Sequence, residues 1–416
     1  MRGFTHRTLA GAAQSWIDAR TAPLAEEGVP LIDAAGRVLT REIASPVDVP
    51  GFDRAMMDGF AVQAADTTGA SLYNRLPLPV VGLLLPGHVP STAVERGQAI
   101  RIMTGAPLPP GADAVLPAEK AELDGEQILV LDEVTPGKHV GQRGEDVVAG
   151  SVVLPRGRRL RPQDVGVLSA IGCASVPVVR RPVVQLVITG NELLPAGELP
   201  RGCLIADANG PMLASLVRRD GGQPRQPDIV PDRYDAILAA LTADADIVLV
   251  SGGSSVGQED LAPAILAEHG QLAIHGVAMR PSGPTGMGTL GTRLVFLLPG
   301  NPVSCLCAYD LFAGRAVRAL AGLSRDWPYR VARLPLERKL VSVVGRLDYA
   351  RVRIREGRVE PLAISGASLL TSTTRADGFV LIPEDSEGYP ADTVVEVFLY
   401  DECPTAPCLN SSNSWT

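Results

Sequence analysis

Glycine and hydroxyl side chains are concentrated in one short stretch, residues 251–257, directly after the apolar run 247–250. The apolar run is typical of a parallel strand buried on both faces. Three glycines and three serines in seven residues allow backbone N–H groups to approach a ligand closely. Asp260 then stands where a helix cap belongs, before the helical stretch 261–269. Strand, small-residue loop and helix start together suit an anion such as phosphate, although a glycine-rich turn with a capping Asp explains this loop alone equally well.

Two further strand ends carry the same kind of sequence. The buried-strand runs 183–188 and 294–298 lead into Thr189-Gly190-Asn191-Glu192 and Pro299-Gly300-Asn301-Pro302. Helical stretches at 212–219, 234–243, 261–269 and 303–321 alternate with the strands, which predicts a doubly wound domain with a mainly parallel sheet. Ligands in such sheets bind beyond the carboxyl ends of the strands. Three such loops at one sheet edge therefore indicate a polar pocket rather than unrelated turns.

The chain is too long, at 416 residues, for a single hydrophobic core. Short apolar strands between Pro/Gly turns flank the α/β region and are typical of smaller β-rich domains. We predict a multidomain α/β plus β protein. Its parts are an N-terminal helix and linker segment at 1–48 that packs with 143–180, a small β-rich domain at 49–142, a linker domain at 143–180, the α/β domain at 181–325, a C-terminal β domain at 326–403 and a tail at 404–416 that is expected to be disordered.

Composition excludes several classes of function. A net charge of −8 argues against nucleic acid as a main partner, because no basic excess is available to pair with its phosphates. The six cysteines form no C-x-x-C pair and have no His at metal-site spacing, so neither a zinc site nor a disulfide framework is indicated. No apolar run reaches membrane-spanning length, and the N-terminus lacks a signal-peptide pattern. We therefore expect a cytoplasmic protein without a membrane partner.

Three polar segments before the α/β region each allow more than one interpretation. Asp58 is followed by Gly59 just before a predicted strand, and a turn at this point explains the pair without any role in catalysis. Thr104-Gly105 opens a proline-rich loop, which either presents a hydroxyl and a backbone N–H to a ligand or only stiffens a connection. The charged segment 141–147 marks the exit from the first β-rich domain, and four arginines between 156 and 161 are interpreted as a solvated turn.

Six of these segments, in this order, resemble the MoeA family, the molybdopterin molybdenumtransferases, which includes the E domain of gephyrin. They are PVDVPGFDRAMMDGFAV (46–62), IRIMTGAPLPPGADAV (100–115), RGED (143–146), ITGNEL (188–193), SGGSSVGQED (251–260) and LPGNPVS (298–304). The resemblance covers residues 8–399. Related molybdopterin adenylyltransferase-type proteins share an SGG-containing α/β domain but lack counterparts of the first two motifs.

The resemblance implies an elongated, L-shaped subunit that forms a homodimer. The active cleft would lie between the α/β domain and the Met57-Asp58-Gly59 segment of the partner subunit. The implied activity is Mg²⁺-dependent insertion of molybdate into adenylylated molybdopterin, with release of AMP. A separate molybdopterin adenylyltransferase would supply the substrate, and apo-molybdoenzymes or their chaperones would receive the product.

Carried over residue by residue, the resemblance implies the catalytic positions Asp58, Thr104, Asp146, Glu192, Asp232 and Asp260. The implied substrate-binding positions are Gly105, Thr189, Gly190, Asn191, Asp207, Asn209, Ser251, Gly252, Gly253, Ser255, Arg280, Pro281, Pro299, Gly300, Asn301 and Pro302. A hard divalent ion such as Mg²⁺ prefers carboxylate oxygens, and Glu192 and Asp260 are its implied ligands. Asp260 also suits a plain helix cap, and Asp207 with Asn209 suits a turn and cap before the helix at 212–219.

The chain departs from the family pattern at two positions. Where many members carry a basic residue, Pro-Gly and then Lys-Pro, this chain has Arg280-Pro281-Ser282-Gly283-Pro284, so Gly283 replaces the second cation. Ala55 replaces a common Ser before the Asp58 motif. Arg280 and the hydroxyls of Ser282 and Thr285 are expected to replace part of the lost anion contact. The alternatives are a tungstate-specific paralogue and a non-catalytic molybdopterin-binding carrier or scaffold. A nucleotide or sugar phosphate enzyme would account for the Ser-Gly-Gly loop alone.

Overall fold

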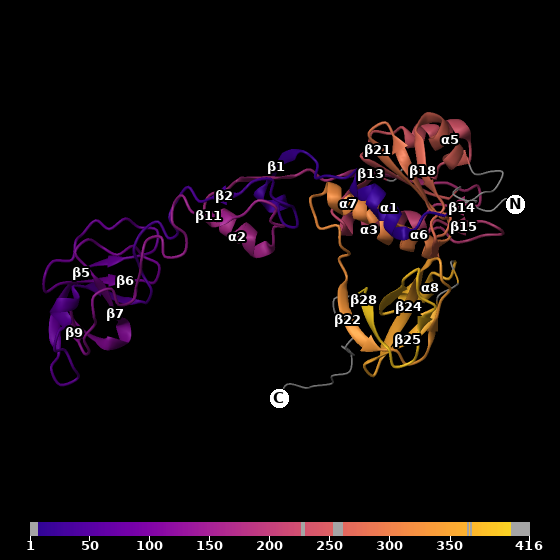
Figure 1. Cartoon of the computed structure of the whole chain (residues 1–416). Helices are drawn as coiled ribbons and strands as arrows, with labels where there is room; N and C mark the ends of the chain where they lie inside the picture. The colour runs from indigo at the N-terminus through magenta and orange to yellow at the C-terminus, as the bar shows by residue number, and fades with distance from the viewer. Residues whose placement is uncertain (1–6, 226–228, 253–260, 364–365, 367, 401–416) are drawn as a thin grey trace. The chain divides into compact units, whose positions relative to one another are not determined.

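The structure is a computed structural model that describes residues 7–225, 229–252, 261–363, 366 and 368–400. The chain divides into two compact units (Figure 1). The first unit contains the residues up to Glu27, the short segment Gly36–Val38 and the residues from Val179 onward. The second contains Gly28–Ala35 and Leu39–Val178. None of the described helices is long and apolar enough to cross a membrane.

A six-stranded sheet is the centre of the first unit. Its order is β16 (Gln223–Arg225), β13 (Val183–Ile188), β17 (Ile247–Ser251), β21 (Arg293–Leu298), β20 (Gly286–Leu290) and β18 (Gln271–His275). The first four strands are parallel, β20 pairs antiparallel with β21, and β18 pairs antiparallel with β20, so β20 alone among the six runs in the opposite direction. Ser251 pairs with Ile188 on one side and Leu298 on the other, so three strands end at one edge. The expectation of a mainly parallel sheet is confirmed.

Helices cover both faces of this sheet because its central strands are apolar on both sides. Alternate residues such as Leu249 and Val250 face two different cores. The first core is completed by α1 (Ala10–Asp18), α3 (Asn209–Arg219), α6 (Pro302–Ala308) and α7 (Gly314–Leu320). The second is completed by α4 (Tyr234–Leu241) and α5 (Leu261–His269). Figure 1 shows α5 on one side of the sheet and α1, α3, α6 and α7 on the other.

Buried ion pairs connect α3 to the last long helix. We expected one helix at 303–321, and the structure instead joins α6 to α7 through a π-helical turn, η4 (Tyr309–Ala313). Asp310 of this turn is fully buried, accepts a hydrogen bond from Arg219 at 3.0 Å and receives another from the Tyr329 hydroxyl at 2.9 Å. Burial raises the pKa of Asp310, and Arg219 opposes that rise. Arg318 donates to Asp220, which is also buried, at 3.0 Å.

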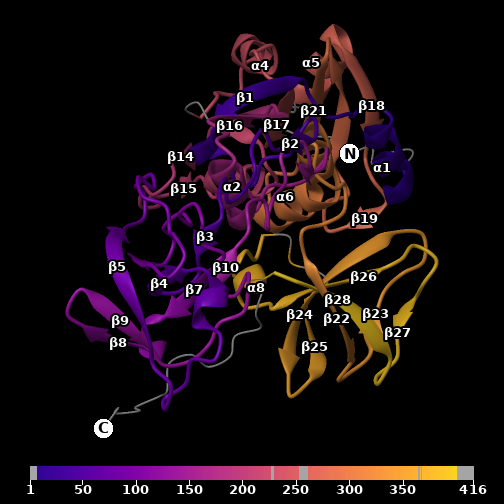
Figure 2. The same cartoon turned by 90° about the vertical axis from the view of Figure 1, so that its left-hand side faces the viewer.

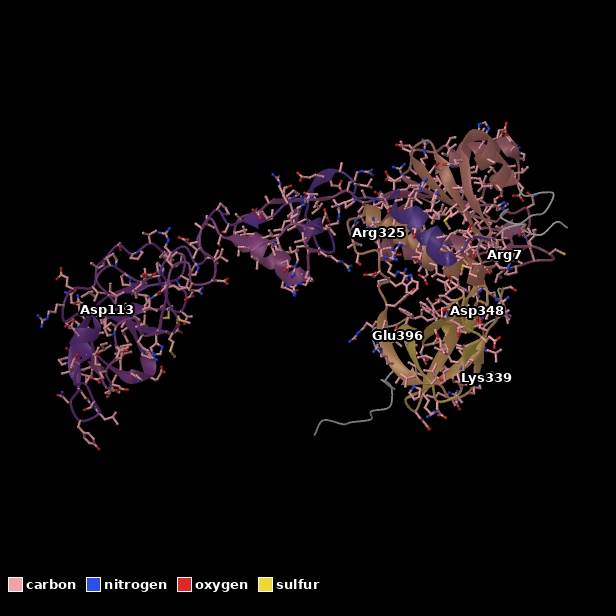
Figure 3. All side chains as sticks on the ribbon, in the orientation of Figure 1. Arg7, Asp113, Arg325, Lys339, Asp348 and Glu396 are labelled. Atoms are coloured by element: carbon pink, nitrogen blue, oxygen red, sulfur yellow. The ribbon has the colours of Figure 1, made fainter. Side chains whose placement is uncertain are left out.

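A second, C-terminal sheet packs against the first core. Its order is β19 (Met279–Arg280), β24 (Leu347–Arg355), β26 (Gly378–Ile382), β28 (Val394–Leu399) and β22 (Arg330–Pro335), and β25 (Arg358–Ala363) also pairs with β24. The strands from β22 to β28, which include the short pair β23 (Leu340–Val341) and β27 (Gly388–Tyr389), are orange to yellow in Figure 2. Phe379 stacks on Tyr349 and Phe398 within an aromatic group at the junction with the first core. Figure 3 labels Asp348 at the end of β24 nearer the α/β domain.

The second unit contains another six-stranded sheet and a small helix-containing core. The sheet order is β7 (Ala114–Pro117), β4 (Gly59–Val62), β6 (Ala99–Ile102), β5 (Leu76–Leu84), β9 (Gln127–Val130) and β8 (Ala121–Asp124). Next to it, β3 (Arg54–Ala55) pairs with β10 (Val140–Gly141). The helix-containing core is formed by α2 (Pro162–Ala170), β1 (Glu26–Pro30), β2 (Ile43–Ala44), β11 (Val152–Leu154) and β12 (Ser175–Val179).

Two of the four arginines between 156 and 161 also have a structural role, in addition to their place in an exposed turn. Arg158 and Arg161 both donate to the buried carboxylate of Asp164, at 3.0–3.2 Å. The Arg161 side chain, followed by that of Arg158, holds the pKa of Asp164 well below its usual range. The carboxylate also accepts the backbone N–H of Arg161 at 2.9 Å and so caps α2. Spacing alone did not show this because the acceptor lies inside the helix that follows.

Asp220→Ala tests the buried ion pairs of the first unit. Removing one partner leaves the buried Arg318 guanidinium without its carboxylate, and we expect the free energy of unfolding to fall by about 3–5 kcal/mol. Urea unfolding followed by tryptophan fluorescence reports on this unit, because Trp16 and Trp327 pack against its core. Asp235→Ala is the control, since its pair with Arg233 is exposed and worth less than about 1 kcal/mol. Equal losses in the two variants would contradict a structural role for the buried pairs.

Candidate functional site

A cavity of about 460 Å³ lies at the carboxyl ends of the parallel strands. Its lining comes from the end of β13, the pair β14 (Leu193–Leu194) and β15 (Ile205–Ala206), the start of α3, the end of β17, the turn before α6, and Ser368. The predicted site residues in this lining are Thr189, Glu192, Asp207, Asn209, Ser251, Gly252, Gly300, Asn301 and Pro302. The three strand-end loops that the sequence singled out therefore share one cavity.

Asn209 joins these loops. Its side-chain amide nitrogen donates to the Ser251 hydroxyl at 2.8 Å and to the Gly300 carbonyl at 2.7 Å. The residue is only 7% exposed, and its Oδ1 is buried without a hydrogen-bond partner among the described residues. A buried amide oxygen without a partner is costly. A donor group on a bound ligand would satisfy it.

Asp207 holds Asn209 in position. One carboxylate oxygen of Asp207 accepts the backbone N–H groups of Asn209 and Gly210, both at 2.9 Å, where α3 begins. These are the bonds of a turn and a helix cap. The structural interpretation of this residue is therefore supported, although Asp207 also lines the cavity.

Two acidic residues near the first strand end have different surroundings. The Asp232 carboxylate accepts a hydrogen bond from the Thr189 hydroxyl and another, at 3.2 Å, from the backbone N–H of Asn191. These bonds order the loop after β13. Glu192 is exposed, lines the cavity and makes no side-chain hydrogen bond or ion pair with the part of the chain that the structure describes. Its carboxylate is free to bind a cation or a ligand donor.

Close contact between two loops requires glycine at position 252. Gly252 has φ +104°, and a Cβ atom there would lie 2.1 Å from the Thr189 carbonyl oxygen. At Gly300 a Cβ atom would lie 3.6 Å from its nearest neighbour, the Cα atom of Gly252. The cavity wall therefore depends on backbone packing that a side chain at 252 would prevent.

Several predicted residues lie outside this lining. Gly190, Asn191 and Pro299 adjoin it in sequence, whereas Gly253, Ser255 and Asp260 fall outside the described residues. Arg280 and Pro281 belong to the segment that includes β19, and Arg280 pairs at 2.6 Å with the fully buried Asp348. Asp348 also accepts from Arg346 at 3.0 Å and from Ser342 at 2.8 Å.

The hydroxyls expected to compensate for Gly283 are used within the fold. Ser282 Oγ donates to the Ser304 carbonyl at 2.5 Å, and Thr285 Oγ1 donates to the Ser282 carbonyl at 2.7 Å. Both residues are buried. The expectation that they replace part of an anion contact is therefore wrong for this structure.

A second cluster of predicted residues lies in the second unit. One carboxylate oxygen of Asp58 accepts two hydrogen bonds from Thr104, one from its backbone nitrogen at 2.7 Å and one from its hydroxyl oxygen at 2.6 Å. The Thr104 hydroxyl and then its N–H hold the pKa of Asp58 below its usual value, so the exposed carboxylate is ionised at neutral pH. The backbone N–H of Gly105 donates to the Ala55 carbonyl at 2.8 Å, which fixes the two loops together.

The RGED segment reaches the same loops. The backbone N–H of Arg143 donates to Asp53 at 2.8 Å, and Glu145 pairs with Arg54 at 3.0 Å. Asp146 is exposed, and its backbone N–H donates to the Val49 carbonyl at 3.1 Å. Its side chain makes no hydrogen bond with Asp58 or Thr104 in the described structure.

Sequence reasoning missed part of the cavity wall. Ser368 lines it, although no motif singled out from the sequence lies near it, and Ile205 and Ala206 line it directly before the predicted residue Asp207. Ser368 comes from a segment more than 60 residues after the last strand-end loop, and only the folded chain shows its place. No group of three or more His, Cys, Asp or Glu that could hold a metal ion occurs among the described residues.

Gly252→Ala and Gly300→Ala form a matched pair that tests the loop contact. We expect Gly252→Ala to lower the free energy of unfolding by about 1–3 kcal/mol, because alanine disfavours the positive φ and its Cβ meets a carbonyl oxygen. Gly300→Ala has room for its methyl group and should leave the stability unchanged or raise it by up to about 1 kcal/mol. Urea unfolding of both variants provides the comparison. An unchanged free energy of unfolding in Gly252→Ala would mean that the loops do not need this close contact.

Family models match the chain in three consecutive regions. The "MoeA N-terminal region (domain I and II)" matches residues 9–172, the "Probable molybdopterin binding domain" matches 185–319, and the "MoeA C-terminal region (domain IV)" matches 333–400.

Similar proteins match over most of the chain. Molybdopterin molybdenumtransferase 2 of Mycobacterium tuberculosis is 34% identical, over 89% of this chain and 94% of the relative. Molybdopterin molybdenumtransferase of Bacillus subtilis is 33% identical, over 90% of each. The crystal structure of the molybdopterin biosynthesis MoeA protein from Pyrococcus horikoshii superimposes with a TM-score of 0.80, at 33% identity, over 95% of this chain and 100% of the other. On these matches and the shared architecture, the chain belongs to the MoeA family.

Proposed function

We propose that this chain acts in molybdenum cofactor biosynthesis as a transferase that inserts molybdate into adenylylated molybdopterin and releases AMP. The observation that carries the proposal is the cavity formed by three strand-end loops around Asn209, in a chain whose relatives are named molybdopterin molybdenumtransferases. The anionic phosphates of the substrate suit glycine-containing loops at strand ends. Departure from the family pattern at Gly283 keeps tungstate as an alternative oxyanion and a binding-only carrier as an alternative function.

The polar groups of the cavity match an adenylylated substrate. Asn209 Oδ1 has no partner among the described residues and is able to accept a hydrogen bond, and a nucleotide offers donors in its ribose hydroxyls and its adenine amino group. Asp232 orders the loop that contains Thr189 and Asn191, and this fixes the conformation of the first strand end, where the phosphates of the substrate would bind. We assign Asp232 a positioning role for this reason.

Mg²⁺ fits the donor chemistry of the cavity. Glu192 provides an exposed carboxylate that has no other partner among the described residues, and hard divalent ions prefer such oxygens. Glu192 would hold the ion, together with Asp260, which lies outside the described residues. When bound, the ion supplies positive charge that offsets the charge on the departing AMP.

We further infer a homodimer in which the Asp58 segment of the partner subunit completes the cleft. Asp58 and Thr104 are exposed, hydrogen-bonded to each other and located in the second unit, whereas the cavity lies in the first. A molybdopterin adenylyltransferase would supply the substrate, and apo-molybdoenzymes or their chaperones would receive the product.

AMP release from adenylylated molybdopterin with Mg²⁺ is the primary test, comparing molybdate, tungstate and no oxyanion. We expect molybdate-dependent release, and Glu192→Gln should lower it at least about tenfold and raise the Mg²⁺ requirement, because the amide is a weaker ligand for a hard cation. Glu198→Gln is the control, since Glu198 is exposed and its nearest cation, Arg201, is 3.9 Å away. Tungstate preference would reassign the oxyanion. Tight substrate binding without AMP release would favour the carrier.

Mixed dimers test the shared cleft. A dimer of one Asp58→Ala subunit and one Glu192→Ala subunit contains one intact site if each site uses Asp58 and Glu192 from different subunits, so we expect about half of the wild-type activity. A dimer of Glu192→Ala and Asp232→Ala subunits is the control, because both changes lie in the first unit and no intact site forms. Purified mixed dimers without activity in the first combination would rule out sharing.

A further inference from the structure

We propose that Arg101 is a ligand-binding residue, and that the cavity which it shares with Asp58 takes a flat heterocycle with N–H donors and a carbonyl acceptor on one edge. This cavity has a volume of about 310 Å³ and lies within the second unit. Asp58 and Arg101 are its charged lining residues, and Phe60, Met103 and Leu123 provide much of its apolar wall. An apolar pocket with a few convergent polar groups is typical of small-molecule sites.

No partner among the described residues explains the position of the Arg101 side chain. Arg101 lies on β6, opposite Phe60 of β4, and its side chain is exposed, whereas the other residues of β6 are buried. It makes no hydrogen bond or ion pair with the described residues. Arg54 and Arg143 of the same unit are paired instead, with Glu145 and Asp48. The Arg101 guanidinium therefore remains available to a ligand in the cavity.

Asp58 is held as a fixed acceptor beside this guanidinium. Thr104 occupies one carboxylate oxygen with two hydrogen bonds and leaves the other oxygen for a ligand. These bonds lower the pKa of Asp58 most, and the nearby charge of Arg101 lowers it further. At neutral pH the cavity therefore presents a negative acceptor and a positive donor that do not form an ion pair.

This pair of charges selects against simple ions. A small anion at Arg101 meets the negative charge of Asp58, and a cation at Asp58 meets the positive charge of Arg101. A neutral planar ring with both N–H groups and a carbonyl oxygen on one edge satisfies both side chains, and its faces contact the apolar walls. Under the proposed function this ring is the 2-amino-4-oxo pterin of the substrate, and that identification rests on the proposed function.

Binding of pterin to the full chain, followed by the fluorescence of the ring, tests the inference. Lumazine has a carbonyl group where pterin has its 2-amino group, so we expect it to bind at least about tenfold more weakly to the wild type. Asp58→Asn should remove this preference, because the amide both donates and accepts. Arg101→Gln should weaken pterin binding at least about tenfold. Arg156→Gln, a change at an exposed arginine outside the cavity, should have no effect.

Three outcomes would overturn the inference: equal pterin affinity in the wild type and Arg101→Gln, an unchanged pterin-to-lumazine ratio in Asp58→Asn, or complete displacement of pterin by inorganic phosphate at similar concentration. Circular dichroism confirms that each variant is folded. The assay contains no molybdate and measures no turnover. If one of these three outcomes occurs but the protein still releases AMP in a molybdate-dependent manner, the inference about Arg101 is wrong and the proposed function is retained.

Discussion

The approach of the strand-end loops to one another is the constraint on which the candidate site depends. Loops after β13 and β17 touch where Gly252 lies against the Thr189 carbonyl, and the Asn209 amide connects the end of β17 to the turn before α6. Both contacts use backbone atoms or a short side chain, so they set the spacing of the loops closely. The hydrogen bonds of Asp207 fix where α3 begins and therefore where Asn209 lies. The shape of the cavity thus follows from the packing of the sheet edge rather than from long, adaptable side chains.

Two sets of acidic residues in this chain differ in burial and in their partners. Asp164, Asp310 and Asp348 are buried, and arginine donors surround each of them, because an unpaired buried carboxylate would destabilise the fold. Asp58 and Glu192 are exposed and face cavities. Asp310 and Asp348 hold together segments that are far apart in sequence, through Arg219 and Arg280, whereas Asp164 holds the turn before α2 through the nearby Arg158 and Arg161. The second set keeps acceptor oxygens accessible, which a ligand or cation requires.

Much of the architecture could be predicted from local pattern. The run 183–188 and the helix 261–269 have the predicted bounds, because a buried parallel strand and a helix between a loop and a glycine leave clear apolar signals. The predicted loops share a cavity because parallel strands end at one edge. The partner of Arg280 could not be predicted, because Asp348 lies in a different domain and belongs to no recognisable motif in the sequence. The π-helical turn at Tyr309–Ala313 was also missed. In the sequence Asp310 looks like an ordinary helix residue, and only the folded chain shows that it is buried and paired with Arg219.

The segment from Gly276 to Thr285 contacts three parts of the first unit at once. It pairs with Thr8 near the N-terminus, receives support from Ser304 in α6, and contributes β19 to the C-terminal sheet next to Leu347. A strand of the C-terminal sheet is therefore encoded inside the α/β region, ahead of β20, β21 and α6. Cutting the gene between these two regions would leave the backbone groups of β24 at Leu347 and Asp348 without their partner strand. A C-terminal fragment that begins after Arg280 would therefore lack one strand of its own sheet.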